Sequence, residues 1–188
     1  MKSPVIADNK VPALPRSEWS SHANYPRQTL LLGSHENFRN ISEHLVKESM
    51  LAWSTSAAKA PRSDLSRLFW RWKSAMSSHE GYEEGKLYPY LHAKYGVSMG
   101  ALELHHKSLN LAAEKVRAAE GNGDALQFAH AIKKHHEILI PHLAEEEEVV
   151  IPLLLELDSR EFERYKNGHI AVLLREIERE GKGAQTNG

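Results

Sequence analysis

The sequence predicts an all-α protein built around an antiparallel, up-down four-helix bundle, with an extended N-terminal arm and an additional C-terminal amphipathic helix. Apolar residues recur at a spacing of about 3.6 along four long segments, near residues 27–53, 63–88, 98–120 and 124–150. No segment alternates between apolar and polar residues over any length, so almost no β-sheet is expected. Two stretches, 79–91 and 142–154, share residues at fixed offsets, which indicates a repeated helix pair.

The first predicted helix follows residues 1–26, a Pro- and Ser-rich stretch that we expect to form an extended arm. Its core-facing stripe contains Leu31, His35, Phe38, Ser42, Leu45 and Ala52. Small residues connect it to the second helix, and Ser63 or Asp64 can cap that helix. The second stripe contains Leu65, Leu68, Phe69, Trp72, Met76 and His79. Both stripes predict helices that bury one face.

The third helix is expected after a longer crossing over residues 90–100, which include two glycines. Its stripe contains Leu102, His106, Leu109, Ala113 and Val116. The run 121–123 (Gly-Asn-Gly) ends this helix, and Asp124 is a favourable N-cap for the fourth. The fourth stripe contains Phe128, Ile132, His135, Leu139, His142 and Glu146. We expect this helix to end near Pro152.

Beyond the bundle, an amphipathic pattern predicts one additional C-terminal helix followed by a tail. Its apolar face contains Phe162, Tyr165, Val172, Leu173 and Ile177. The predicted organisation is therefore an arm over 1–26, a metal-binding bundle over 27–157, and the C-terminal helix and tail over 158–188.

Composition excludes several classes of function. The 188 residues include 24 Lys and Arg against 25 Asp and Glu, so no basic excess favours a nucleic-acid partner. The absence of cysteine excludes disulfides, zinc-thiolate sites, iron–sulfur clusters and thiol catalysis. The longest apolar run is too short to span a bilayer, and no signal-peptide core is evident, so we expect a cytoplasmic protein without a membrane partner.

The repeated stretches read HEGYEEGKLYPYL from His79 and HLAEEEEVVIPLL from His142. In both, glutamates follow the histidine by four and five residues, proline by ten and leucine by twelve. Residues four apart lie on one helix face, with Cβ atoms about 5–6 Å apart. His79 with Glu83, and His142 with Glu146, can therefore reach one ion or two adjacent ions. A histidine and carboxylate set without sulfur favours iron or manganese, with zinc as an alternative.

The first and third helices each place one histidine in the core-facing stripe. His35 and His106 are both followed by apolar or small residues at positions +3, +6, +7 and +10. A buried imidazole needs a partner, which a metal between facing helices provides. Of the other histidines, His135 is interpreted as a buried structural residue or a support for the ligands, and His44 as solvated. His105 projects about 100° away from His106, so it is interpreted as a surface residue or a support for the ligands.

The four predicted helices carry, in order, one histidine, an HxxxE motif, one histidine and a second HxxxE motif. This arrangement resembles the hemerythrin-like HHE cation-binding family, over about residues 30–155. The resemblance implies a non-heme centre of two iron ions, bridged by oxygen (Fe–O–Fe) or carboxylate. The implied ligands are His35, His79, Glu83, His106, His142 and Glu146.

The sequence departs from the oxygen-carrying hemerythrins on two helices. Those carriers have two histidines four apart on the third helix, whereas Leu102 and Asn110 flank His106 here. Their fourth-helix carboxylate comes five residues after its histidine, so Glu147 competes with Glu146, and the internal repeat favours Glu146. Whether Glu147, Glu103 or Glu80 also binds metal stays open.

The resemblance implies binding of dioxygen or nitric oxide for sensing, storage or a stress response. One alternative is a di-iron oxidase or an enzyme that consumes peroxide or nitric oxide, and another is an iron-handling protein. The sequence indicates neither a pocket for an organic substrate nor a reductase partner, which favours a role other than catalysis. Tyr82, within one turn of His79 and Glu83, is a candidate proton donor.

Overall fold

The structure is a computed structural model that describes residues 14–25, 29–55 and 60–185. Among these residues it contains helices and no strand, which confirms the predicted all-α class. None of the helices in this part of the chain has the length and apolar character that a membrane span requires. Contacts divide the chain into two compact units, which are described separately below.

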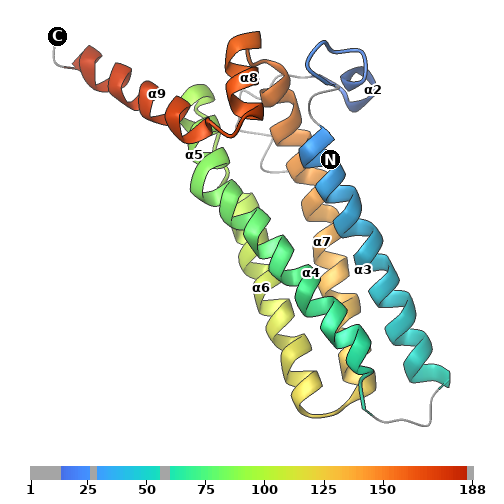
Figure 1. Cartoon of the computed structure of the whole chain (residues 1–188). Coiled ribbons are helices and arrows are strands. Elements are labelled where there is room, and N and C mark those ends of the chain that lie inside the picture. Colours follow the sequence, from blue (N-terminus) through green and yellow to red (C-terminus); the bar gives the residue numbers. More distant parts are fainter. Residues whose placement is uncertain (1–13, 26–28, 56–59, 186–188) are drawn as a thin grey trace. The chain divides into compact units, whose positions relative to one another are not determined.

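The bundle unit comprises Gly33–Glu80 and Glu103–Ala144. It is built from segments of four helices, which Figure 1 shows running up and down beside one another: α3 (Thr29–Thr55), α4 (Ser63–Tyr82), α6 (Gly100–Gly121) and α7 (Ala125–Leu155). Most of the predicted apolar stripes meet in its core. The buried core residues are Phe38, Leu45, Leu65, Phe69, Trp72, Met76, Leu109, Ala113, Val116, Ala119, Phe128, Ile132, Leu139 and Leu143.

The turn between α6 and α7 contains the glycine and the N-cap residue that the sequence predicted there. Gly123 adopts a positive φ of 66°, a conformation that a residue without a Cβ adopts at no steric cost. Oδ1 of Asp124 accepts a hydrogen bond of 2.9 Å from the backbone N–H of Gln127, so Asp124 caps α7. This tight turn places α7 antiparallel to α6 within the bundle unit.

His135 is a polar residue inside the apolar core of the bundle unit. It is 1% exposed, and its ring packs edge to face against Phe69 and Trp72. Neither ring nitrogen has a hydrogen-bond partner among the described residues. Burial, followed by the charge of Lys73, lowers the pKa of His135 from 6.5 to about 3. The imidazole is therefore neutral at physiological pH, in agreement with its interpretation as a buried structural histidine.

The terminal unit comprises the described parts of Met1–Leu32, Gly81–Leu102 and Glu145–Gly188. Besides the ends of the long helices, it contains α2 (Arg16–Trp19), the π-helix η2 (Glu83–Leu87), α5 (Tyr88–Tyr95), α8 (Ser159–Lys166) and α9 (Ile170–Gln185). α5 packs against η2 and α9, and α8 packs against α9. Its core includes Trp19, Leu87, Tyr88, Tyr90, Leu91, Val149, Leu153, Leu154, Phe162, Ile170 and Leu173.

Three predicted boundaries in this unit were wrong. The expected crossing at residues 90–100 is helical as far as Tyr95, because Tyr90 and Leu91 are fully buried, and Gly96 (φ 69°) ends α5. α7 passes Pro152 and ends at Leu155, since burial of residues 149–155 outweighs the helix penalty of about 3 kcal/mol for proline. The C-terminal helix is two helices, separated near Gly168 (φ 77°).

The N-terminal stretch was predicted to be an extended arm. Residues 1–13 and 26–28 lie outside the described residues, but 14–25 form α2 and turns. Trp19 is 3% exposed, and its indole N–H donates to the carbonyl of Leu14 at 3.0 Å. The Asn24 amide donates to the carbonyls of Leu155 and Leu157, both at 2.9 Å. This part of the arm is thus folded against the end of α7, because it carries a buried tryptophan.

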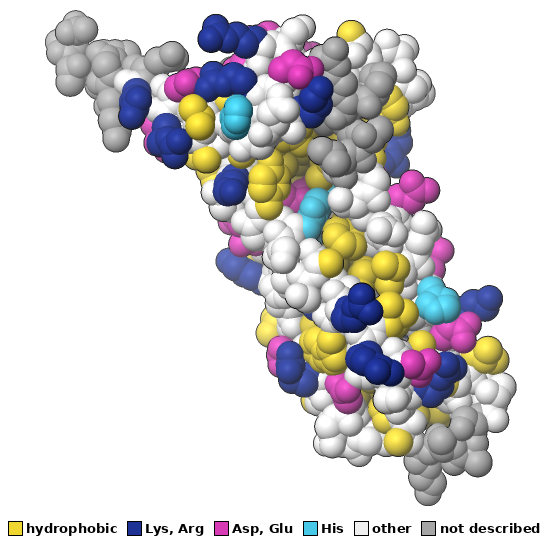
Figure 2. All heavy atoms as spheres, in the orientation of Figure 1, with side chains coloured by type: hydrophobic (Ala, Val, Ile, Leu, Met, Phe, Trp, Pro, Cys, Tyr) yellow, Lys and Arg dark blue, Asp and Glu magenta, His cyan; other side chains and the backbone are white. Residues whose placement is uncertain are grey.

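The surface carries charges of both signs. On the face in Figure 2, Lys and Arg side chains lie among Asp and Glu, with apolar side chains between them. The large apolar residues that are exposed are Leu51, Trp53, Leu104, Leu111 and Val172. Single exposed apolar side chains are normal for a folded domain and need no further explanation.

Two leucines of α6 allow a matched test of the core. Leu109 is fully buried, whereas Leu111 is 67% exposed. We expect Leu109→Ala to lower the free energy of unfolding by about 2–5 kcal/mol, because it leaves a cavity. Leu111→Ala should change it by less than about 0.5 kcal/mol. Urea unfolding of both variants measures this difference, and similar losses in the two would contradict the core assignment.

His135 predicts a pH dependence of stability. Its pKa is lowered on folding, so the contribution of neutral His135 to the free energy of unfolding is fully present above pH 6.5. This contribution is lost as the pH falls towards about 3. His135→Leu removes this titration, so the stability of wild type relative to the variant should fall by about 1 kcal/mol per pH unit within that window. Urea unfolding at pH 7.5 and pH 5 tests this. Parallel pH profiles for the two proteins would show that His135 is not held neutral.

Candidate metal centre

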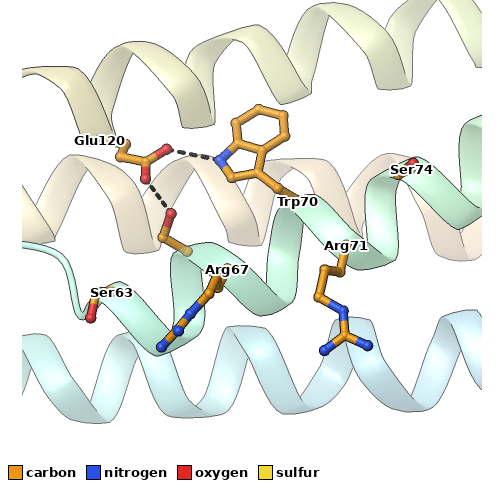
Figure 3. A pocket seen from close by; sticks show the side chains of 7 residues that line it. Ser63, Arg67, Trp70, Arg71, Ser74 and Glu120 are labelled. Carbon is orange, nitrogen blue, oxygen red and sulfur yellow. Dashed lines mark hydrogen bonds between the residues drawn. The ribbon is translucent and has the colours of Figure 1, made fainter.

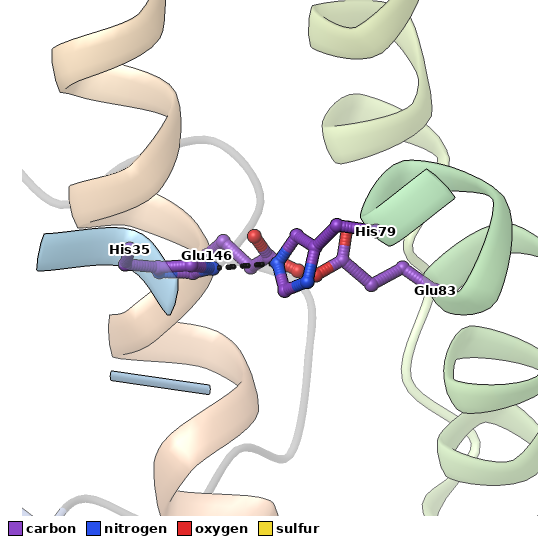
Figure 4. A group of neighbouring side chains, drawn as sticks. All are labelled: His35, His79, Glu83 and Glu146. Carbon is purple, nitrogen blue, oxygen red and sulfur yellow. Dashed lines mark hydrogen bonds between the residues drawn. The ribbon is translucent and has the colours of Figure 1, made fainter. Parts of the chain in front are cut away.

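α3 and α4 bring the first two predicted ligands together in the bundle unit. The Nε2 atoms of His35 and His79 lie 3.1 Å apart, and the ring centroids lie 5.2 Å apart. Figure 4 shows the two side chains pointing toward one another. With metal–nitrogen distances of about 2.1 Å, two ligands at a right angle also lie about 3.0 Å apart. The ring of Phe38 packs edge to face on His79. The two nitrogens therefore converge as two ligands of one ion would.

The third and fourth predicted histidines face each other from α6 and α7. The rings of His106 and His142 have centroids 4.7 Å apart, and both residues are buried. Burial is the main cause that lowers the pKa of His142 to about 3, and His106, His105 and His79 lower it further. The imidazole of His142 is therefore neutral, which is the form that binds a metal ion.

The two predicted carboxylates are in the terminal unit, and both are fully buried. Glu83 begins η2 directly after α4, and π-helical turns of this kind occur frequently at functional sites. Glu146 lies on α7, four residues after its histidine. Its Oε1 accepts a hydrogen bond of 2.7 Å from the hydroxyl of Tyr88. This bond fixes the orientation of the Glu146 carboxylate.

Tyr88 was not identified by sequence reasoning, which pointed to Tyr82. Burial, followed by the charges of Glu146 and Glu83, raises the pKa of Tyr88 well above 10, so the hydroxyl keeps its proton and donates it. In a π-helix the repeat is i to i+5, which places Tyr88 one turn after Glu83. The internal repeat has isoleucine at the equivalent position, Ile151, and so gave no signal for this tyrosine.

Four of the predicted ligands form a group that suits a metal ion. His35, His79, Glu83 and Glu146 each offer one ligand atom, and these atoms lie within 4.8 Å of one another (Figure 4). All are buried except His79, which is half-buried. Buried carboxylates require nearby positive charge, and nitrogen with oxygen donors suits iron and manganese. The donor set therefore fits a cation. His106 and His142 are outside this group.

Two of the competing glutamates have cationic side chains as partners. The Glu147 carboxylate, buried on α7, forms an ion pair with Arg16 of α2. Oε2 of Glu80 lies 3.2 Å from Nζ of Lys73, and both side chains are buried. The third competitor, Glu103, is half-buried and lies outside the four-residue group. The structure thus favours Glu146 over Glu147 as a ligand.

Comparison with known proteins gave one match. A family model described as the hemerythrin HHE cation binding domain matches residues 28–154. No curated protein and no solved structure matches the chain. The matched range covers well over half of the chain and contains all six residues predicted as ligands.

Adjacent glutamates on α7 provide a matched test of the ligand assignment. We expect Glu146→Gln to lower the metal content of the purified protein by about one ion per chain, because it removes a buried anionic ligand. Glu147→Gln should leave the content unchanged, since that carboxylate pairs with Arg16. Elemental analysis of both variants measures the content. Equal losses, or a larger loss for Glu147→Gln, would reverse the assignment.

Proposed function

Because this chain belongs to the hemerythrin HHE cation-binding family, we propose that its buried histidines and glutamates hold a pair of iron ions and that the reduced protein binds dioxygen or nitric oxide. The observation that carries this proposal is the convergence of His35, His79, Glu83 and Glu146 within 4.8 Å. Zinc suits the same donors but is redox-silent, and manganese is the closest substitute. Ferrous iron would supply the electrons that dioxygen accepts.

The six predicted ligands are of two kinds, carboxylates that provide negative charge and imidazoles that provide nitrogen donors. Glu83 and Glu146 provide negative charge, and a carboxylate can bridge two ions. The imidazoles of His35, His79, His106 and His142 provide nitrogen donors. Six protein ligands do not fill the coordination of two octahedral ions, so positions remain for a small diatomic molecule. This count supports gas binding rather than a purely structural metal site.

The surroundings favour a small apolar ligand. Phe38 covers one side of the His79 ring, and the core of the bundle unit is apolar. The hydroxyl of Tyr88 holds a proton at Glu146 Oε1, where it stabilises the ligand carboxylate. One face of the His79 ring is thus covered by an apolar side chain, and the Tyr88 hydroxyl keeps its proton beside Glu146 across physiological pH.

Two grooves of the bundle unit lie away from these residues. A groove of about 860 Å³ is lined by α4 residues and Glu120, which accepts hydrogen bonds from Trp70 and Ser66 (Figure 3). A second groove, of about 710 Å³, is lined by α4 and α6 residues. Neither includes any of the six predicted ligands. An organic substrate bound in either of these two grooves would not contact the six predicted ligands.

Reduction followed by exposure to air tests the proposal. Iron-loaded protein, reduced without oxygen, should develop near-ultraviolet charge-transfer absorption when oxygen is admitted. We expect slow conversion to the oxidised form, because His106 is flanked by Leu102 and Asn110 rather than by a further histidine four residues away. His44→Ala, at an exposed position, should behave like wild type, and His79→Ala should lose the response.

Other outcomes of this experiment discriminate the alternatives. No spectral change, or zinc as the sole metal after growth in iron-replete medium, would show a structural metal site instead. Rapid loss of iron to a mild chelator would support iron handling. Steady turnover of peroxide or nitric oxide would support the enzymatic alternative.

A further inference from the structure

One groove of the bundle unit lies beside α4 and carries two arginines. Its volume of about 860 Å³ is in the range of pockets that bind small organic molecules. No predicted metal ligand lines it, so the groove is separate from the candidate metal centre. The residues that line it all belong to the bundle unit, and they are Ser63, Ser66, Arg67, Trp70, Arg71, Ser74 and Glu120.

The two arginines of this groove are exposed and lie one helical turn apart on α4. Figure 3 shows Arg67 and Arg71 extending from the same side of the helix. Within the described part of the chain, neither guanidinium forms an ion pair or a hydrogen bond. Like charges at positions i and i+4 repel one another and destabilise a helix. A bound anion would relieve this repulsion and provide a partner for both side chains.

The carboxylate that lines the groove is already engaged with other groups. Oε1 of Glu120 accepts a hydrogen bond from the hydroxyl of Ser66, and Oε2 accepts one of 2.8 Å from the indole N–H of Trp70. Both oxygens of this carboxylate thus have a donor, and neither donor is an arginine. The hydroxyls of Ser63 and Ser74 make no hydrogen bond to another described residue. They are therefore available, with the two guanidiniums, to a ligand that accepts hydrogen bonds.

We propose that this groove binds a small molecule through a phosphate group, which Arg67 and Arg71 hold together. The planar guanidinium group donates two parallel hydrogen bonds to phosphate oxygens. A phosphate monoester carries a charge of about −1.5 to −2 at pH 7, which matches two guanidiniums better than the single charge of a carboxylate does. Trp70 forms an apolar wall for the rest of the molecule. This inference goes beyond the proposed function and does not depend on it.

Phenyl phosphate and benzenesulfonate are matched probes, because they share an aromatic ring but carry about two charges and one charge, respectively. Calorimetric titration of the full chain with phenyl phosphate should show one saturable site, and benzenesulfonate should bind more weakly by about tenfold or more. Arg67→Gln combined with Arg71→Gln should raise the Kd for phenyl phosphate by about tenfold or more, because charge-assisted hydrogen bonds are lost. Lys133→Gln combined with Lys134→Gln removes the same charge from exposed positions of α7 and should leave the Kd unchanged.

The indole N–H of Trp70 shows where the probe binds. In the NMR spectrum of the zinc-loaded full chain, its cross-peak, assigned with Trp70→Phe, should shift when phenyl phosphate is added, because Trp70 lines the groove. Circular dichroism checks that both double variants keep the helical fold. The proposal would be overturned by any one of four results: no saturable binding, an unmoved Trp70 signal, equal affinity for the two probes, or equal losses in the two double variants.

Discussion

The burial of Glu83 and Glu146 is the constraint on which the rest of the site depends. An ionised carboxylate in an apolar interior is very unfavourable unless charge or hydrogen bonds compensate it, and both of these residues are fully buried. A bound metal cation supplies that charge. Because a metal ion binds the folded arrangement and not the separate side chains, its binding free energy contributes to folding. The neutral state of His142 belongs to the same arrangement, since a protonated imidazole cannot bind a metal.

Two acidic residues that lie directly beside predicted ligands have cationic partners of their own. Glu80 follows His79 directly and forms a buried ion pair with Lys73. Glu147 follows Glu146 and pairs with Arg16. These partners offset the negative charge that would otherwise accumulate next to the ligands. Of the pair Glu146–Glu147, one member thus belongs to the candidate metal group and the other pairs with Arg16, which lies far away in the sequence.

Much of this could be predicted from the sequence because it rests on periodicity and local spacing. The apolar stripes predicted the long helices, and the HxxxE repeat identified His79, Glu83 and Glu146 as candidate ligands. Their roles as ligands stay predictions. Tyr88 was missed because its position depends on a π-helical turn, which no spacing rule for α-helices anticipates. Pro152 was wrongly predicted to end the fourth helix. The helix continues past it because the burial of its neighbours outweighs the low helix propensity of proline.

The contacts of Arg16 and Asn24 with α7 also have a consequence for the order of folding during synthesis. They join residues 131 to 133 positions apart. At a translation rate of about 5–20 residues per second, the N-terminal residues emerge roughly 7–26 seconds before the part of α7 that they contact. During this interval Trp19 has no completed core to enter, and Glu147 has not yet been made. This segment therefore docks only after the end of α7 has been synthesised, and until then Trp19 on the ribosome-bound chain is accessible to chaperones.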